Sequence, residues 1–243
     1  MDSSPSPQSP SPQDRDTQTP FLAGPDPVDP DGDARGPVLT SPPTGDPIDR
    51  ATRAARRLVD ALLRTSRDSP DLSRITEELD SIADNLEAHC PEVEERLADM
   101  WGGEGVTRHD PVTGPENAIA PPVVLAGKDD GSIEGVVTLT LPYQGPPRMV
   151  HGGVSALLLD HTLGVANYWA GDSGMTAELT LRYHRPTPLF EPLTITGRQV
   201  SVEGRKIRTE GQIATADGQV CVSAQGLFIN KHLPRPGHQQ PES

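Results

Sequence analysis

A pair of glycines followed by an acidic residue is the part of this sequence best suited to chemistry. Gly152 and Gly153 follow His151 and open a run rich in alanine and leucine, which Asp160 interrupts about two turns later. Glycine lets a ligand come close to the backbone. The first amides of a helix lack partners within the helix and lie at the positive end of its dipole. The start of this run is therefore suited to holding a carbonyl oxygen as it becomes an oxyanion.

Asp160 lies in an otherwise apolar helix, expected over residues 151–170. Its apolar side chains point in nearly every direction, which is typical of a buried helix. Because an uncompensated buried carboxylate is costly, we expect Asp160 to be either a hydrogen-bonded structural anchor or a catalytic group. Gly152 and Asp160 are eight residues apart, or about 12 Å along the axis. One helix cannot bring both to the same carbonyl, so joint action requires two subunits.

Strand-like segments precede and follow this helix. They alternate apolar and polar residues or are separated by good hairpin turns, and they cover residues 133–141, 176–184, 193–202, 206–215 and 219–229. The turns are Glu203-Gly204 and Asp217-Gly218. The order strand, helix and four strands predicts an α+β fold in which an antiparallel sheet curls around one central helix.

The first hundred residues have a different character. The chain has 27 prolines and only 3% aromatic residues, so its ordered part is expected to be much shorter than its 243 residues. Helical spacing predicts one helix capped by Asp46, a second opened by Ser69-Pro70-Asp71 and a shorter third from Pro91. We expect a disordered tail at 1–45, a helical extension at 46–101, the sheet domain at 102–232 and a disordered tail at 233–243.

Composition excludes several function classes. The net charge of −14 argues against nucleic acid or an anionic membrane as the main partner. No apolar run reaches the length of a membrane span, and the start lacks the pattern of a secretory signal. Cys90 and Cys221 show no metal-ligand spacing. These features predict a cytoplasmic protein with no metal and no cofactor.

The stretch that begins at residue 150 resembles the PaaI-type hotdog acyl-CoA thioesterases. The resemblance covers roughly residues 110–230, about half of the chain, and its residues are Val150-His151-Gly152-Gly153, Asp160, Gly164, Met175-Thr176-Ala177-Glu178-Leu179 and Tyr183-His184-Arg185-Pro186. It implies a hotdog fold and the hydrolysis of acyl-CoA to free acid and CoA. It also implies a homodimer or homotetramer with active sites at the subunit interface.

The resemblance assigns roles by motif position. Asp160 matches the family's acidic catalytic residue, as a general base acting on water or as a nucleophile. Gly152 and Gly153 match the oxyanion segment, with the Gly152 amide as the first choice. Thr176 matches a position where some members have a hydroxyl that orients the water or the carboxylate, although as a strand residue it could instead face solvent. His151 is expected to shape the loop by hydrogen bonding, with a role as base as the alternative.

The phosphates of CoA call for basic groups. Arg185, Arg205 and Lys206 lie at expected strand ends or turns and are the candidate substrate-binding residues. His161 points to another helix face than Asp160 and is expected to be structural. Two other functions stay open: a non-catalytic acyl-CoA-binding hotdog module, and a hotdog enoyl-thioester hydratase, whose loop motif of Asp and His before the helix is absent here. The sequence leaves open the acyl chain and the role of the tail and the first helices.

Overall fold

The computed structural model describes residues 36–41, 43–95, 108–121 and 123–230. Two helices come first, α1 (Pro47–Arg64) and α2 (Leu72–Glu87). The later elements are β1 (Val124–Gly127), β2 (Ser132–Thr138), the short 3-10 helix η2 (Leu141–Tyr143), α5 (Gly152–Trp169), β3 (Met175–Tyr183), β4 (Pro192–Glu203), β5 (Lys206–Thr215) and β6 (Val220–Ile229).

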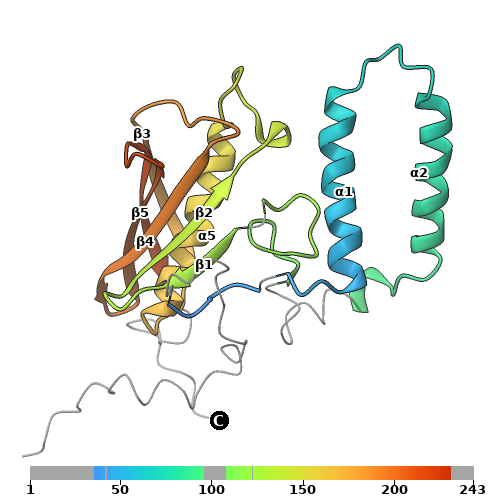
Figure 1. Ribbon diagram of the computed structural model, residues 1–243. Coiled ribbons are helices and arrows are strands. Elements are labelled where there is room, and N and C mark those ends of the chain that lie inside the picture. The colour runs from blue at the N-terminus through green and yellow to red at the C-terminus, as the bar shows by residue number, and fades with distance from the viewer. Residues whose placement is uncertain (1–35, 42, 96–107, 122, 231–243) are drawn as a thin grey trace, which may run out of the picture.

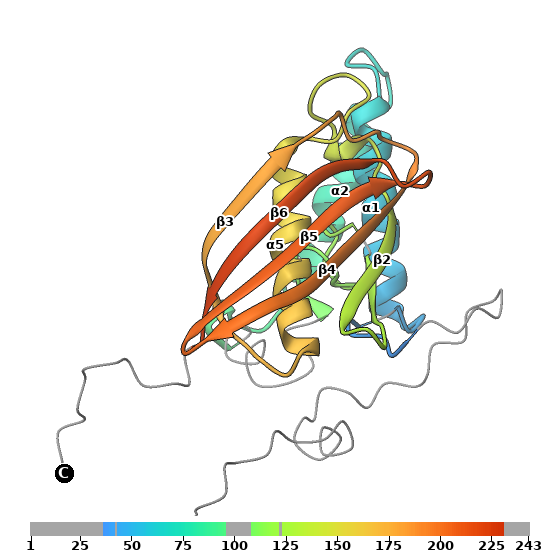
Figure 2. The same ribbon diagram turned by 90° about the vertical axis from the view of Figure 1, so that its left-hand side faces the viewer.

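The strands form one antiparallel sheet in the order β1-β2-β4-β5-β6-β3. Figure 2 shows this sheet in front of α5, with the strands crossing the helix obliquely. The predicted α+β hotdog architecture is confirmed. Strand β1 was not predicted, because three of its four residues are buried and it therefore lacks the alternation of a half-buried strand.

Two glycine turns set the register of the last three strands. Gly204 and Gly218 adopt left-handed φ angles of 59° and 81°, which glycine reaches without strain. The first turn places Glu203 opposite Lys206 across β4 and β5. The second lies between β5 and β6, so both predicted hairpins are confirmed.

The core lies between the sheet and one face of α5. Leu158, Leu159 and Leu163 of the helix are fully buried against inward-facing strand residues, among them Ile133, Ile195, Ile207, Val222 and Phe228. Gly211 of β5 lets the helix approach, because a Cβ there would lie 2.9 Å from the Leu163 side chain. The opposite face of α5 is open, and Leu157 is 42% exposed. The prediction of a helix buried all round is therefore wrong for a single chain.

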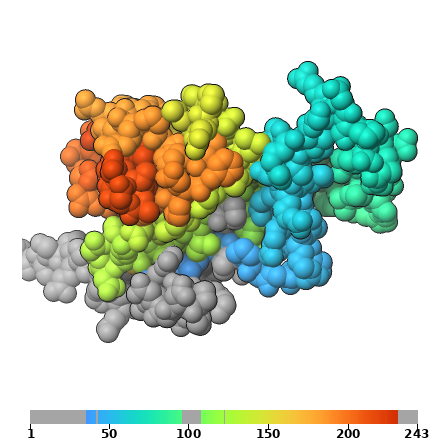
Figure 3. Space-filling model, turned by 45° about the horizontal axis from the view of Figure 1, so that its top comes forward, coloured from blue at the N-terminus to red at the C-terminus, as the bar shows by residue number. Residues whose placement is uncertain are grey.

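The helical extension projects from the side of the sheet domain (Figures 1 and 3). No residue of α2 is buried, whereas α1 buries Asp49 and Thr52. The predicted third helix begins with a helical turn at residues 93–95, and its remainder lies outside the described residues. Residues 37–40, which the sequence assigned to the disordered tail, instead lie along β1, where the Leu39 N–H donates to the Leu125 carbonyl at 2.8 Å.

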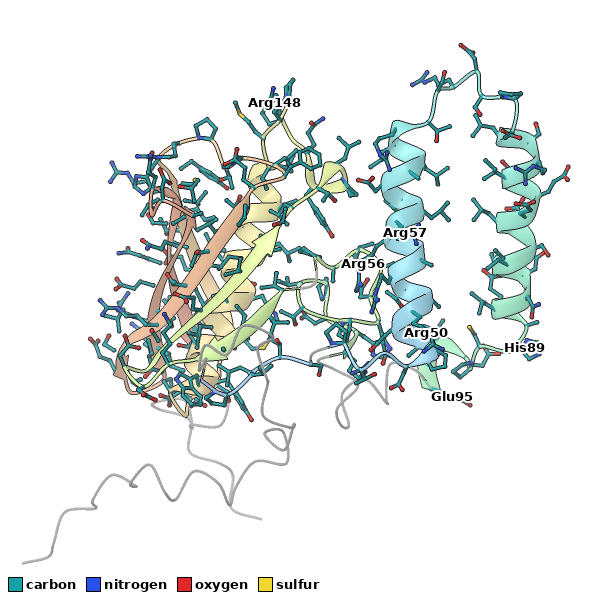
Figure 4. The ribbon with its side chains drawn as sticks, in the orientation of Figure 1. Arg50, Arg56, Arg57, His89, Glu95 and Arg148 are labelled. Atoms are coloured by element: carbon teal, nitrogen blue, oxygen red, sulfur yellow. The ribbon has the colours of Figure 1, made fainter. Side chains whose placement is uncertain are left out.

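Charged side chains attach α1 to the loop at residues 108–117. Arg108 donates from Nη2 to Asp49 Oδ1 at 2.7 Å and also forms an ion pair with Glu116. Arg56 donates from Nη2 to the carbonyls of Gly114, Pro115 and Asn117, at 3.0, 2.9 and 2.8 Å (Figure 4). These contacts dock α1 through polar groups, and the large apolar residues Ile48, Val59, Leu62 and Leu63 of α1 stay exposed.

The capping prediction for Asp46 needs correction. Asp46 is the N-cap residue, but its side chain makes no capping hydrogen bond and accepts from Thr44 Oγ1 at 2.6 Å. Asp49 is the acidic residue that matters here. Burial opposes its ionisation, but hydrogen bonds from Thr44 and Arg108 outweigh that cost and hold the pKa of Asp49 below its usual value.

Replacing Asp49 with Ala is expected to destabilise the protein by about 3 kcal/mol at pH 7, because it removes one partner of a buried ion pair. The matched control is Asp60→Ala, which breaks a partly exposed pair with Arg64 on the same helix and should cost less than about 1 kcal/mol. Denaturant unfolding measures both.

The stability that Asp49 adds is expected to depend on pH. Since the folded pKa of Asp49 is lowered, its contribution to the free energy of unfolding is present above its unfolded pKa near 3.9 and is lost as pH falls through the folded value. The two variants should therefore converge in stability at acid pH, and a constant difference would contradict this account.

Candidate active site

The start of α5 leaves one backbone amide free. The Gly153 N–H donates to His151 Nδ1 at 3.0 Å, and the Tyr183 hydroxyl donates to the Gly152 carbonyl at 2.9 Å. The peptide unit that joins the two glycines is thus held at both ends. Within the described part of the chain, the Gly152 N–H has no hydrogen-bond partner. Only this amide is available to a ligand at the helix start.

His151 is the N-cap residue of α5 and shapes the turn that leads into the helix. Its ring accepts a hydrogen bond from the Gly153 N–H, and the backbone N–H of His151 donates to the Tyr143 carbonyl at 2.9 Å. These bonds agree with the loop-shaping role that the sequence suggested. Burial raises the pKa of the Tyr143 phenol to about 12, so Tyr143 stays neutral beside this turn.

Asp160 accepts a hydrogen bond from Thr176. The distance from Thr176 Oγ1 to Asp160 Oδ1 is 2.9 Å, and Asp160 is half-buried rather than buried. Simple alternation along β3 would place Thr176 on the same face as Glu178. A bulge between these two residues shifts the register, so Thr176 pairs with the inward-facing Phe228 and points toward α5. Of the two predicted positions of Thr176, facing solvent or contacting the carboxylate, the bulge produces contact with the carboxylate.

Strand β3 contacts α5 at both places that could do chemistry. Thr176 near its start bonds Asp160, and Tyr183 at its end bonds Gly152. Tyr183 was not among the predicted site residues. Its signal in the sequence was a phenol on the apolar side of a strand, where a hydroxyl needs a partner. The free amide and the carboxylate lie about 12 Å apart on one helix, so one chain does not bring them together.

The three basic residues predicted to bind substrate are also separated. Arg185 donates to Gln219 Oε1 beside the start of β6. Arg205 donates from Nε to the Asn230 carbonyl at 3.1 Å, and Lys206 pairs with Ile229 at the other end of β6. Arg185 therefore lies at the Gly152 end of the sheet, whereas Arg205 and Lys206 lie at the Asp160 end.

A second cluster has the order of a nucleophilic triad. Thr113 Oγ1 lies 3.3 Å from His161 Nε2, and His161 Nδ1 lies 3.2 Å from Asp110 Oδ2. Thr113 is only 3% exposed, so its hydroxyl is closed to a substrate carbonyl. Burial opposes ionisation of Asp110, but His161 and the amides of Val112 and Thr113 hold its pKa below the usual value. The cluster fixes the 108–117 loop to α5, in agreement with the structural role expected for His161.

No group of three or more His, Cys, Asp or Glu side chains in the described residues is arranged to hold a metal ion. None of the described helices is both long and apolar enough to cross a membrane.

Comparison with solved structures identifies the family. The crystal structure of a thioesterase superfamily protein is 70% identical to this chain, with a TM-score of 0.75, and the match covers 82% of this chain and 98% of that one. The chain belongs to the thioesterase superfamily. The family model of this superfamily matches residues 148–222, which contain α5, β3 and the candidate site. The membership of a hotdog thioesterase family that the resemblance implied is thereby confirmed.

Two further matches cover shorter parts of the chain. A model described as the N-terminal helical domain of hypothetical protein RHA1_ro05818 matches residues 39–95, the segment of α1 and α2. A stretch of 49 residues is 43% identical to acyl-coenzyme A thioesterase THEM4 of Xenopus laevis, over 20% of this chain and 22% of that protein. This chain thus matches about a fifth of the length of that curated relative.

Replacing Thr113 with Val tests whether the second cluster is structural. The variant keeps the shape of the side chain and removes the hydroxyl next to His161. We expect thioester hydrolysis within about threefold of wild type and a loss of stability of about 1 kcal/mol from the missing hydrogen bond. A nucleophile would behave differently, because its removal lowers turnover by several orders of magnitude. Steady-state kinetics and denaturant unfolding on the same sample distinguish the two.

Proposed function

We propose that this chain is an acyl-CoA thioesterase whose active site forms between two copies of the chain. The observation that carries the proposal is the pair of half-sites at the two ends of β3. One is the free amide of Gly152, and the other is the Asp160 carboxylate with its Thr176 partner. Each supplies what thioester hydrolysis needs, and neither is sufficient alone.

The exposed edge of the sheet provides a way to join the two halves. Among the described strands, β3 pairs only with β6, and seven of its nine side chains are exposed. An unpaired strand edge is a template for another strand. A second copy related by a two-fold axis would add its own β3 antiparallel to this one. The Thr176 end of each strand would then lie near the Tyr183 end of the other, and Asp160 of one copy would approach Gly152 of the other.

The same two-fold axis would cover the open face of α5 and gather the basic residues. Leu157 lies on that open face and would gain apolar neighbours from the second copy. Arg205 and Lys206 of one copy would approach the end where Arg185 of the other lies, although one chain holds them apart. Phosphates are the natural ligands of such a cluster, which supports CoA as the leaving group. The short match to an acyl-coenzyme A thioesterase supports the same substrate class.

The proposed reaction uses the two halves in sequence. The Gly152 N–H donates a hydrogen bond to the thioester carbonyl oxygen and stabilises the negative charge that develops on it. Asp160, oriented by Thr176, then takes a proton from a water whose oxygen attacks the carbonyl carbon. The tetrahedral intermediate collapses, the carbon–sulfur bond breaks, and the thiolate of CoA leaves and takes up a proton. In the alternative route Asp160 attacks directly, and water hydrolyses the resulting anhydride.

Replacing Asp160 with Asn should lower kcat/KM for acyl-CoA by about a thousandfold or more, because the amide neither accepts the proton nor attacks. Thr176→Val should lower it only about tenfold, the effect of one lost hydrogen bond. Free-thiol release measures both, and the melting temperature must stay close to wild type. Hydrolysis in ¹⁸O-labelled water separates the routes, since only the nucleophilic route places label in the Asp160 carboxylate. Full activity in Asp160→Asn would end both.

Tyr183 is expected to act as a positioning residue, because its hydroxyl holds the peptide next to the free amide. Tyr183→Phe keeps the ring against Gly152 and should lower kcat about tenfold while KM changes less. Tyr168→Phe is the matched control, because the Tyr168 hydroxyl is buried without a partner among the described residues and can be removed without loss. Equal kcat values in wild type and Tyr183→Phe would remove Tyr183 from the mechanism.

A further inference from the structure

One face of α1 carries a stripe of arginines in an acidic protein. Helix α1 has five arginines against two aspartates, although the whole chain has a net charge of −14. At 3.6 residues per turn, Arg50, Arg53, Arg57 and Arg64 fall within about 60° of one another. Among them, Arg53 and Arg57 have no hydrogen bond or ion pair within the described residues. A cationic surface of this kind is suited to an anionic ligand.

The stripe borders a groove between α1 and the sheet domain. The groove has a volume of about 710 Å³, within the range of small-molecule sites. Helix α1 lines it with Arg56, Arg57 and Arg64 and with the apolar residues Ala54, Leu58 and Ala61, and the sheet domain lines it with Thr140 and Phe190. Asp60 also lines the groove and pairs with Nε of Arg64, so the Nη groups of Arg64 remain without a partner among the described residues. Figure 4 shows Arg57 on α1 and Arg148 at the tip of the loop before α5. Charged groups beside an apolar floor favour a ligand with both phosphate and a flat apolar part.

Phe190 has a backbone conformation that is unfavourable for a bulky residue. Its φ of 64° is in the left-handed region, which costs a bulky residue free energy, and its side chain is still 60% exposed. Arg148, with φ of 67°, is the other non-glycine residue of this kind among the described residues. An exposed aromatic ring in a strained backbone is typical of a ligand contact, because folding alone gains little from it.

The Phe190 loop is tied to the segment that leads into the free amide. The Leu189 N–H donates to the Arg148 carbonyl at 3.2 Å, and the Val150 N–H donates to the Thr187 carbonyl at 2.9 Å. Two residues after Val150 comes Gly152. The loop that carries Phe190 is therefore joined through backbone hydrogen bonds to the segment that leads into the free amide of the same chain.

We infer that this groove binds the adenosine end of CoA, with the adenine on Phe190 and the 3′-phosphate on Arg57 and Arg64. The diphosphate of CoA is then left to the basic cluster that Arg185 would form with Arg205 and Lys206 of the second copy. The inference rests on the proposed thioesterase function for its substrate, but its site lies between the helical extension and the hotdog domain, away from the Gly152 amide and Asp160. Base stacking on an aromatic ring and paired arginine–phosphate bonds are the interactions the groove offers. The extension would thus be a part of the substrate site, which explains why a polar helix is docked so firmly beside it.

The test compares two double variants of the full chain. Arg57→Gln/Arg64→Gln removes two arginines that line the groove, and Arg67→Gln/Arg74→Gln removes two exposed arginines outside it. The two variants are matched because in each of them one of the two arginines has an acidic partner, Asp60 for Arg64 in the first and Glu78 for Arg74 in the second. Calorimetric titration with adenosine 3′,5′-bisphosphate, which needs no turnover, should show affinity about tenfold weaker or worse in the first variant and at wild-type level in the second. Added salt should weaken binding to wild type.

Kinetics separate failure of the groove from failure of the function. The substrates are acyl-CoA and the same acyl group on N-acetylcysteamine, which lacks the nucleotide. In Arg57→Gln/Arg64→Gln the preference for acyl-CoA, as a ratio of kcat/KM values, should fall about tenfold. Cleavage of both thioesters with an unchanged preference would overturn the groove and leave the thioesterase. Nucleotide binding without cleavage of either thioester would overturn the thioesterase and leave the groove.

Phe190 provides an independent check with a conservative rescue. Phe190→Leu keeps an apolar side chain and removes the ring, and should weaken adenosine 3′,5′-bisphosphate binding about fivefold or more. Phe190→Tyr keeps the ring and should bind as wild type does. Equal affinities in the two variants would remove the ring from the site.

Discussion

The one-sided packing of α5 against the sheet is the constraint on which the rest of the structure depends. Leu158, Leu159 and Leu163 bury their side chains on the strands, and Gly211 lets the helix come close. Burial at this scale supplies most of the free energy that holds the domain together. It also fixes which residues face away, so Leu157 and Asp160 must lie on the side that a single chain leaves open.

Strand β3 completes this arrangement because its two inward polar groups meet the helix where chemistry is possible. Thr176 bonds the carboxylate, and Tyr183 holds the glycine peptide so that one N–H remains free. The same strand is the edge of the sheet. The edge that positions both half-sites is therefore the edge through which a second copy would bring them together.

The helical extension is joined to α5 by a continuous set of polar contacts. Asp49 and Arg56 of α1 hold the 108–117 loop, and Asp110 of that loop bonds His161, the residue after Asp160. A change in how α1 docks is thereby connected to the helix that carries the candidate carboxylate. This connection and the cationic groove give the extension a physical reason to be part of a thioesterase chain.

The parts of the fold that follow from local patterns could be predicted, and those that depend on distant partners could not. Strand β5 was predicted at residues 206–215, as observed, because Gly204 and Gly218 mark turns on both sides. The half-open face of α5 could not be read from its sequence, since the residues that a partner would cover are apolar as well. Arg108 lies 59 residues from its ion-pair partner Asp49, and no local sequence pattern predicts an ion pair over that separation.

The candidate site divides in the same way. The glycines and the acid could be selected because each is unusual in its place: two helix-breaking residues at a helix start, and a carboxylate in an apolar run. The direction in which the Thr176 side chain points could not be predicted, because a bulge reverses the alternation of faces expected along a regular strand. The separation of Arg185 from Arg205 depends on the pairing of β6, which the sequence leaves open.

Complementation between two inactive variants tests most directly the claim that two copies build one site. Gly152→Pro removes the free N–H, and His151 already has the ψ of 133° that a residue before proline prefers. Co-expressed with Asp160→Asn under separate tags, it forms mixed dimers in which one of the two sites has both groups intact. The account predicts that each variant alone is inactive and that random mixing restores about a quarter of wild-type activity per subunit. Mixed dimers that form and stay inactive would contradict a site shared between two copies.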